Sequence, residues 1–149
     1  MEFGWINLFG AVIVVLILIP NIIYAVRYKQ DETRTEIPTY LTVCEQVGRY
    51  ACIVLMWLPL LVWKFGFKSV EEFLIYMFGN GVLLLCYYLF WILYSRKKTL
   101  SKAMALAVIP TAIFLLSGIL LRHPLLTAAA ILFGVSHCMI TSAGTRTCS

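Results

Sequence analysis

Long apolar segments separated by short polar ones dominate this chain. Five such segments are present, over about residues 5–26, 47–65, 70–94, 103–121 and 124–141. Each is close to the roughly 20 residues that an α-helix needs to cross the hydrocarbon core of a bilayer. Backbone groups in lipid must be hydrogen-bonded within their own segment, and no segment alternates apolar and polar residues as a barrel strand would. The pattern predicts an all-α integral membrane protein, a single domain over residues 1–149 built as a bundle of five transmembrane helices.

Local signals at the ends of these segments also predict helices. Ser69 followed three residues later by Glu72 is a capping box that predicts the start of the third helix. Pro124 suits the first turn of the fifth helix, and only "RHP" separates it from the fourth, which predicts an antiparallel hairpin. Residues 27–46 form the one long hydrophilic segment. We interpret it as a cytoplasmic loop whose second part, from Pro38 onward, extends the second helix.

Composition excludes a soluble domain. Hydrophobic residues make up 62% of the chain and charged residues 13%, whereas soluble domains have about 45–50% and about 25%. A soluble fold with these proportions would lack the polar surface to cover its core. No basic residue precedes the first apolar segment, so we interpret that segment as a retained span and not as a cleavable signal peptide.

The distribution of basic residues predicts the orientation of the bundle. Lys and Arg residues in the polar segments concentrate on the cytoplasmic side of membrane proteins. One predicted side holds nine of the 12 basic residues: Arg27, Lys29, Arg34, Arg49, Arg96, Lys97, Lys98, Lys102 and Arg146. The other holds Lys64, Lys68 and Arg122. We therefore expect the N-terminus outside and the C-terminus in the cytoplasm. The net charge of +5 is then a topology signal and indicates no nucleic-acid partner.

Polar residues within the spans concentrate in the predicted cytoplasmic half, and they are the candidate ligand-binding residues. Asn21 and Tyr24 share a face of the first helix, Glu45 and Arg49 are spaced as a helical ion pair, and His137 lies in the fifth helix. One interpretation is that Arg49 reaches the membrane interface with Glu45 beside it. The alternative is that these groups converge on a polar pocket that opens to the cytoplasm under an apolar cap, because ionisable groups in membrane segments indicate function.

Asn80 is the sixth candidate ligand-binding residue, near the middle of the third helix. Gly79 and Gly81 beside it predict a close approach of two helices. Exposing a side-chain amide to lipid costs free energy, because lipid offers it no hydrogen-bond partner. We therefore expect Asn80 either to bond to a neighbouring helix or to contact a substrate or ion. Three of the predicted spans also contain an internal proline, Pro20, Pro59 and Pro110, and each can produce a kink or a hinge.

The sequence gives little indication of catalysis, and it predicts no metal and no cofactor. The sequence contains no zinc-protease motif, no nucleophile elbow, no dinucleotide-binding motif and no P-loop. The five cysteines form no CxxC pair, and the two histidines lie in different parts of the predicted bundle. We leave enzymatic activity uncertain and lean against it.

Three functions are consistent with these features. The first is binding or transport of a small molecule through the predicted pocket. The second is an accessory or structural subunit of a larger membrane complex, acting through helix packing and the mixed-charge 27–46 loop. The third is a membrane-embedded enzyme that acts on lipid. Expected partners are the lipid bilayer and either a second copy of the chain or another membrane protein. The short loops favour a bacterial cytoplasmic (inner) membrane.

Overall fold

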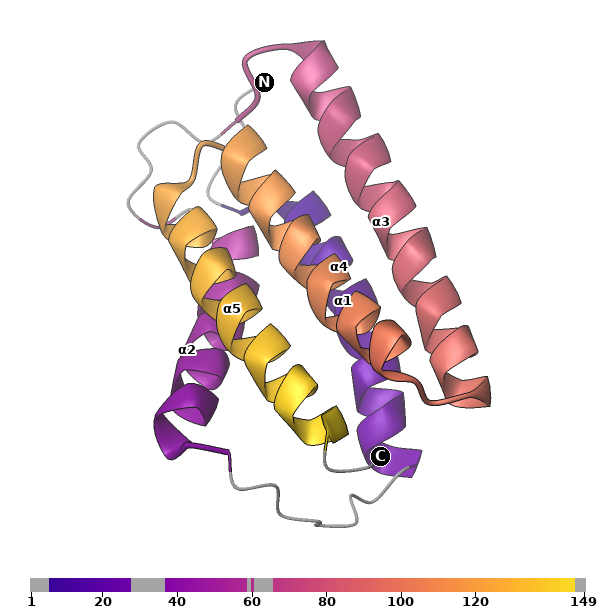
Figure 1. Ribbon diagram of the computed structural model, residues 1–149. Helices are drawn as coiled ribbons and strands as arrows, with labels where there is room; N and C mark the ends of the chain where they lie inside the picture. Colours follow the sequence, from indigo (N-terminus) through magenta and orange to yellow (C-terminus); the bar gives the residue numbers. More distant parts are fainter. Residues whose placement is uncertain (1–5, 28–36, 59, 61–65, 147–149) are drawn as a thin grey trace.

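The computed structural model describes residues 6–27, 37–58, 60 and 66–146, with five α-helices in this part of the chain (Figure 1). They are α1 (Leu8–Arg27), α2 (Thr39–Trp57), α3 (Val70–Arg96), α4 (Leu100–Leu120) and α5 (Pro124–Arg146). Four of them, α1, α3, α4 and α5, are long and apolar enough to cross a membrane. The prediction of an all-helical fold is therefore confirmed, with four of the five described helices long and apolar enough to span a membrane.

Helix α2 departs from the predicted span over residues 47–65. It begins at Thr39, directly after Pro38 as predicted, and ends at Trp57. It carries two charged residues within its length, Glu45 and Arg49, and it is not among the helices that are apolar enough to span. The second half of the predicted 27–46 loop is thus partly helical, while residues 28–36, 59 and 61–65 lie outside the described residues.

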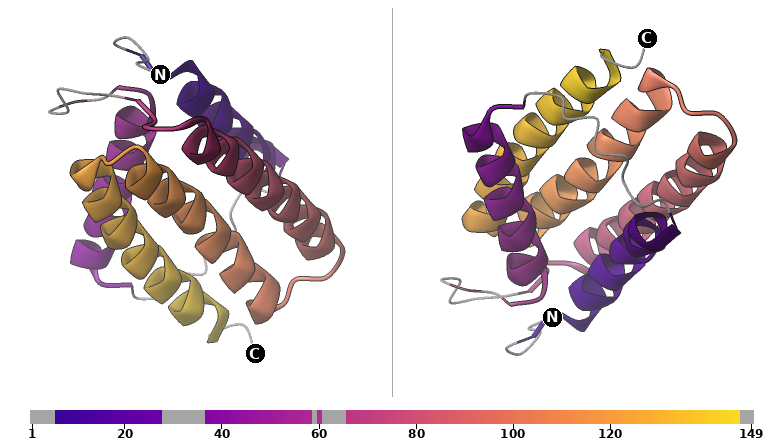
Figure 2. Two further views of the ribbon diagram at one scale, coloured as in Figure 1. Left: turned by 90° about the horizontal axis from the view of Figure 1, so that it is seen from above. Right: turned by 90° about the horizontal axis from the view of Figure 1, so that it is seen from below.

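The helices alternate in direction, so the bundle has two distinct ends (Figure 1). Helices α2, α5, α4 and α3 follow one another side by side, and α1 packs more sparsely against α2 and α3 (Figure 2). The end where α1, α3 and α5 finish and α2 and α4 begin carries Arg27, Arg96, Lys97, Lys98 and Lys102. We call it the basic end, and the other the far end.

Caps and turns at the far end follow the sequence signals. The Glu72 amide donates to the Ser69 hydroxyl at 3.2 Å, and the Glu72 carboxylate accepts from the Lys68 amide at 2.9 Å. The same carboxylate pairs with Arg122 at 2.7 Å, which joins the start of α3 to the α4–α5 turn. Helix α5 begins at Pro124, so the predicted capping box and hairpin are both confirmed.

Pro20 interrupts α1, and a side chain of α3 compensates for the missing backbone bond. Proline has no N–H, so the Leu16 carbonyl four residues earlier loses its helical donor. The Tyr88 hydroxyl donates to that carbonyl at 2.7 Å. The side-chain amide of Asn21 also donates a hydrogen bond to the Ile17 carbonyl, at 3.1 Å. A proline inside a span is thus accommodated by a neighbouring helix, as backbone groups away from water require.

Tyr88→Phe should lower the free energy of unfolding by about 1–3 kcal/mol, because it leaves the Leu16 carbonyl without a donor. In a Pro20→Ala background the amide of residue 20 can donate to this carbonyl, so the same substitution should cost much less. Unfolding of the four proteins in mixed detergent micelles measures both costs. Equal costs in the two backgrounds would contradict this pairing of Pro20 with Tyr88.

Helices α2 and α5 approach each other closely at Gly48. A Cβ atom at this position would lie 2.8 Å from the Phe133 amide nitrogen and 2.9 Å from its Cα atom. No side chain fits there without moving one helix. By contrast, a Cβ atom at Gly81 meets nothing within 4 Å, and one at Gly79 meets only the Leu116 side chain. The predicted close approach is therefore wrong for Gly81, and Gly48 provides it instead.

Gly48→Ala should destabilise the protein, whereas Gly81→Ala should leave it unchanged or stabilise it. Alanine favours a helix over glycine by about 1 kcal/mol at either position. At residue 48 the new methyl group must push α2 away from Phe133, and such overpacking costs about 1–3 kcal/mol. Thermal unfolding in one detergent compares the two variants. A gain in stability from Gly48→Ala would show that α2 and α5 do not meet here.

Candidate functional site

A cavity of about 460 Å³ lies inside the bundle, in the half nearer the basic end, and residues of all five helices line it. Its lining residues are Val14, Ile17, Leu18, Asn21, Tyr24, Ala25, Arg49, Ile53, Tyr87, Leu106, Pro110, Phe114, Phe133 and His137. The volume is within the range of about 300–1,000 Å³ for small-molecule sites. The sparse packing of α1 leaves this space between α1 and the other helices.

The structure brings five of the six candidate ligand-binding residues together. Asn21, Tyr24, Arg49 and His137 all line the cavity. Glu45 is not a lining residue, but it is bonded to two of them, Arg49 and His137. The geometry matches the predicted convergence of polar groups in this half of the bundle.

Polar and apolar groups occupy different depths of the cavity. On α1, Asn21 is one turn nearer the basic end than the apolar Ile17. The same order recurs on α2, with Arg49 and then Ile53. On α5, His137 is one turn nearer the basic end than Phe133. On these three helices a polar lining residue therefore lies one turn nearer the basic end than an apolar one, while Ala25 and Leu106 add apolar surface toward the same end.

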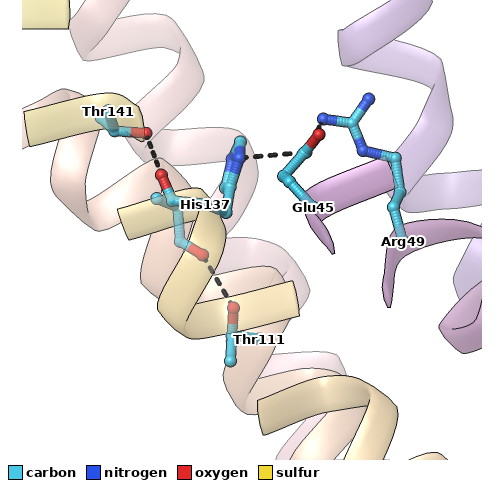
Figure 3. A network of polar contacts seen from close by, with 6 residues as sticks. Glu45, Arg49, Thr111, His137 and Thr141 are labelled. Atoms are coloured by element: carbon cyan, nitrogen blue, oxygen red, sulfur yellow. Dashed lines mark hydrogen bonds and ion pairs between the residues drawn. The ribbon is translucent and has the colours of Figure 1, made fainter. Parts of the chain in front are cut away.

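The contact at Gly48 sets the positions of the charged groups. Helices α2 and α5 run in opposite directions and meet where Gly48 faces Phe133. One turn from this contact toward the basic end, α2 presents Glu45 and α5 presents His137. The His137 Nδ1 atom lies 3.2 Å from Glu45 Oε1 (Figure 3). The His137 ring also stacks on the Phe133 ring of the preceding turn, with centroids 5.1 Å apart.

Glu45 is 3% exposed and accepts bonds from two helices. Arg49, on the next turn of α2, pairs with the same oxygen, Oε1, which confirms the predicted ion pair. A buried carboxylate without a counter-charge would be strongly destabilising, and Arg49 supplies that charge. The Arg49 side chain remains 39% exposed, so it satisfies Glu45 and also presents N–H groups to the cavity.

Aromatic side chains of α3 surround the part of the cavity that Tyr24 lines. The Tyr24 ring lies 5.1 Å from the Trp91 ring and 6.4 Å from the Tyr94 ring. The Lys98 ammonium lies over the Tyr24 ring, 5.8 Å from its centroid. Tyr87 of α3 also lines the cavity, and it was not among the predicted ligand-binding residues. The position of Tyr87, a polar hydroxyl within an apolar segment, could have indicated this role.

Asn80 lies outside this cavity and bonds to its neighbours. Its side-chain amide donates to the Tyr76 carbonyl at 2.9 Å and to the Ser117 hydroxyl of α4 at 3.3 Å. Near the start of α1, the Asn7 amide donates to the Met56 carbonyl at 3.1 Å and to the Tyr76 hydroxyl at 3.4 Å. The bond from Asn80 to Ser117 matches the first of the two interpretations, in which Asn80 bonds to a neighbouring helix. These contacts form a second buried polar cluster, Asn7–Tyr76–Asn80–Ser117, which sequence reasoning missed.

Within the described ranges, no group of three or more His, Cys, Asp or Glu residues is placed to hold a metal ion. Comparison with protein-family models, with curated proteins and with solved structures gives no match to this chain. Function is therefore argued from the site itself.

Arg49→Met should destabilise the protein by about 3 kcal/mol, because it leaves the Glu45 carboxylate buried without a counter-charge. Adding Glu45→Gln to Arg49→Met should recover much of that loss, since the buried group is then neutral. Unfolding in detergent micelles compares the single and double variants.

Arg27→Met is the matched control, because it removes an exposed arginine at the same end of the bundle. It should change stability by less than about 0.5 kcal/mol. A double variant that is less stable than Arg49→Met alone would contradict the role of Arg49 as the counter-charge.

Proposed function

We propose that this chain is a membrane protein that binds a small amphipathic molecule in the cavity, as a binding or transport protein. The observation that carries the proposal is the order of lining residues on α1, α2 and α5, where Asn21, Arg49 and His137 each lie one turn nearer the basic end than an apolar residue. A ligand with a polar head and a short apolar tail matches both kinds of residue. Asn21, Arg49 and His137 provide hydrogen-bonding groups for the head. Phe114 and Phe133 provide apolar surface for the tail.

The proposal includes α2 as a fifth membrane-spanning helix. Its outward face is apolar or aromatic along much of its length, with Val43, Val47, Tyr50 and Val54 all exposed. Its charged residue Glu45 points inward and is compensated there. The low average hydropathy of α2 then comes from the polar residues on its inward face, and its outward face remains apolar. An apolar outer face over a polar inner one is the arrangement that a helix beside a cavity in a membrane requires.

The distribution of charge supports a cavity that opens toward the cytoplasm. Cytoplasmic segments of membrane proteins are enriched in Lys and Arg. Among the described residues, the basic end carries five such side chains near the helix ends, whereas Lys68 and Arg122 lie at the far end. The sparse contacts of α1 support exchange of the ligand, because few packing interactions have to break for α1 to move.

Ile53→Trp should abolish binding, and Val54→Trp should not. Ile53 lines the cavity, whereas its neighbour Val54 is on the outward face of α2. An indole at residue 53 occupies the space that the ligand needs. The probe is 11-(dansylamino)undecanoate, added to the protein in lipid nanodiscs. Energy transfer from tryptophan to the dansyl group is measured, and signal from empty nanodiscs is subtracted.

The second variant controls for the added tryptophan, because both proteins carry one more donor than the wild type. Saturable energy transfer in the wild type and in Val54→Trp, with none in Ile53→Trp, is the expected result. The proposal is wrong if the wild type gives no saturable signal, or if both variants bind equally.

A further inference from the structure

The charge balance of the cavity wall restricts the kind of head group that it can hold. Among the cavity-lining residues, Arg49 carries a permanent positive charge. Glu45 already compensates that charge. The pair is neutral as it stands, and a neutral His137 adds no charge. A ligand that brings a charge into this site must therefore be compensated in its turn, because an unpaired charge is costly at low dielectric.

His137 is placed to provide that compensation. A carboxylate can only accept hydrogen bonds, so the contact of His137 Nδ1 with Glu45 Oε1 at 3.2 Å requires a proton on Nδ1. In the neutral imidazole the other nitrogen, Nε2, then keeps its lone pair. The histidine can add a proton there without losing its bond to Glu45. Because His137 lines the cavity, the new N–H group is available to a ligand.

We infer that the ligand carries an anionic group, and that its binding is accompanied by the uptake of one proton at His137. This inference rests on the proposed function of the cavity. Arg49 donates to the anion with the N–H groups that Glu45 does not use, and the protonated His137 donates from Nε2. The proton comes from water at the basic end, and no covalent bond of the ligand changes. One negative charge and one positive charge enter together, so the site remains neutral.

The titratable group in contact with His137 is Glu45, which we assign as the counter-charge of Arg49 and not as the proton acceptor. The other titratable groups around the site do not provide an equivalent proton. Helix α1 contributes Tyr24 and α3 contributes Tyr87, both phenols, which ordinarily ionise near pH 10. Helix α4 lines the cavity only with Leu106, Pro110 and Phe114. Two lysines lie close to the basic end. Lys98 is over the Tyr24 ring, and Lys102 donates to the Leu93 carbonyl at 3.0 Å. Histidine is the group that ordinarily changes charge between pH 5 and 8.

Titration calorimetry with decanesulfonate tests the inference directly. The sulfonate stays ionised between about pH 5 and 8, so any proton that is taken up binds to the protein. The protein is used as the full chain in nanodiscs of zwitterionic lipid, with empty nanodiscs as the blank. Repeating the titration in buffers of different ionisation enthalpy counts the protons bound per ligand. We expect a value approaching one above pH 7, and an affinity that rises by up to about tenfold for each unit of decrease in pH.

Two substitutions separate this role from a structural one. His137→Gln keeps a donor for Glu45 but cannot gain charge, so binding should become weaker and independent of pH. Glu45→Gln leaves Arg49 uncompensated, so the sulfonate should bind more tightly at pH 8 and without proton uptake. If the contact between Glu45 and His137 were purely structural, Glu45→Gln would not bind the sulfonate more tightly. His123→Gln removes the chain's other histidine, at the far end, and should retain the proton uptake.

Probes with the same tail test the sign of the charge. Decyltrimethylammonium and decanol should bind about tenfold or more weakly than decanesulfonate. The ammonium has no lone pair that could accept a bond from Arg49, and the alcohol oxygen accepts one without carrying the opposite charge. If the ammonium or the alcohol binds as tightly, or if the wild type takes up no proton, the inference is overturned while the cavity remains a binding site. If Ile53→Trp and the wild type give the same blank-corrected heat with all three probes, the proposed function fails as well.

The source of the anion is settled by a second lipid composition. A carboxylate or phosphate could belong to a single-chain amphiphile or to a phospholipid head group. Nanodiscs that contain phosphatidylglycerol distinguish them. If the affinity for decanesulfonate falls more in Glu45→Gln than in wild type, lipid competes for the site, because an uncompensated Arg49 also holds the lipid phosphate more tightly. If the affinity changes equally in both proteins, the lipid phosphate does not occupy the site and the ligand is a free amphiphile.

Discussion

A carboxylate buried among apolar helices must be compensated, and the compensation of Glu45 organises much of this bundle. It determines which face of α2 points inward, because Glu45 and Arg49 lie on that face and α5 supplies the second donor. It also requires α2 and α5 to meet in one register, since a shift of one turn would separate Glu45 from His137. Gly48 makes that register accessible by letting the two backbones touch at Phe133. The site and the packing of α2 against α5 therefore depend on the same few residues.

The cavity exists because the helices are not packed equally well. Four of them form a continuous row, and α1 closes the space with fewer contacts. Prolines occur in the two helices that contribute most to the wall, Pro20 in α1 and Pro110 in α4. At Pro20 the loss of a helical bond is repaired by Tyr88, so the irregular backbone is stabilised by packing. The carbonyl that Pro20 leaves without a helical donor is thus satisfied by a side chain of another helix, α3.

Sequence reasoning could predict what depends on local pattern. Hydropathy gave the helices, Ser69 and Glu72 gave the start of α3, and i,i+4 spacing gave the pair of Glu45 with Arg49. The convergence of polar residues in one half of the bundle was also predicted, because their positions along the helices are local facts. The start of α2 after Pro38 was predicted too, but its end at Trp57 was not, because apolar residues continue in the sequence to about residue 65. The contact between Glu45 and His137 joins residues 92 positions apart in the chain, which no local pattern contains.

The cluster Asn7–Tyr76–Asn80–Ser117 was missed for a related reason, since each bond in it depends on how a helix is rotated about its axis. This cluster lies toward the far end, away from the cavity mouth, and it connects four helices through buried hydrogen bonds. In mechanical terms α1 is held by hydrogen bonds to α2 and α3 near Asn7, and by ring contacts of Tyr24 with α3 near its other end. Helix α1 extends about 30 Å from Asn7 to Arg27. A tilt about Asn7 therefore moves the tip of α1 by roughly 0.5 Å for each degree. Small rotations that leave the far end closed are enough to change the width of the opposite end.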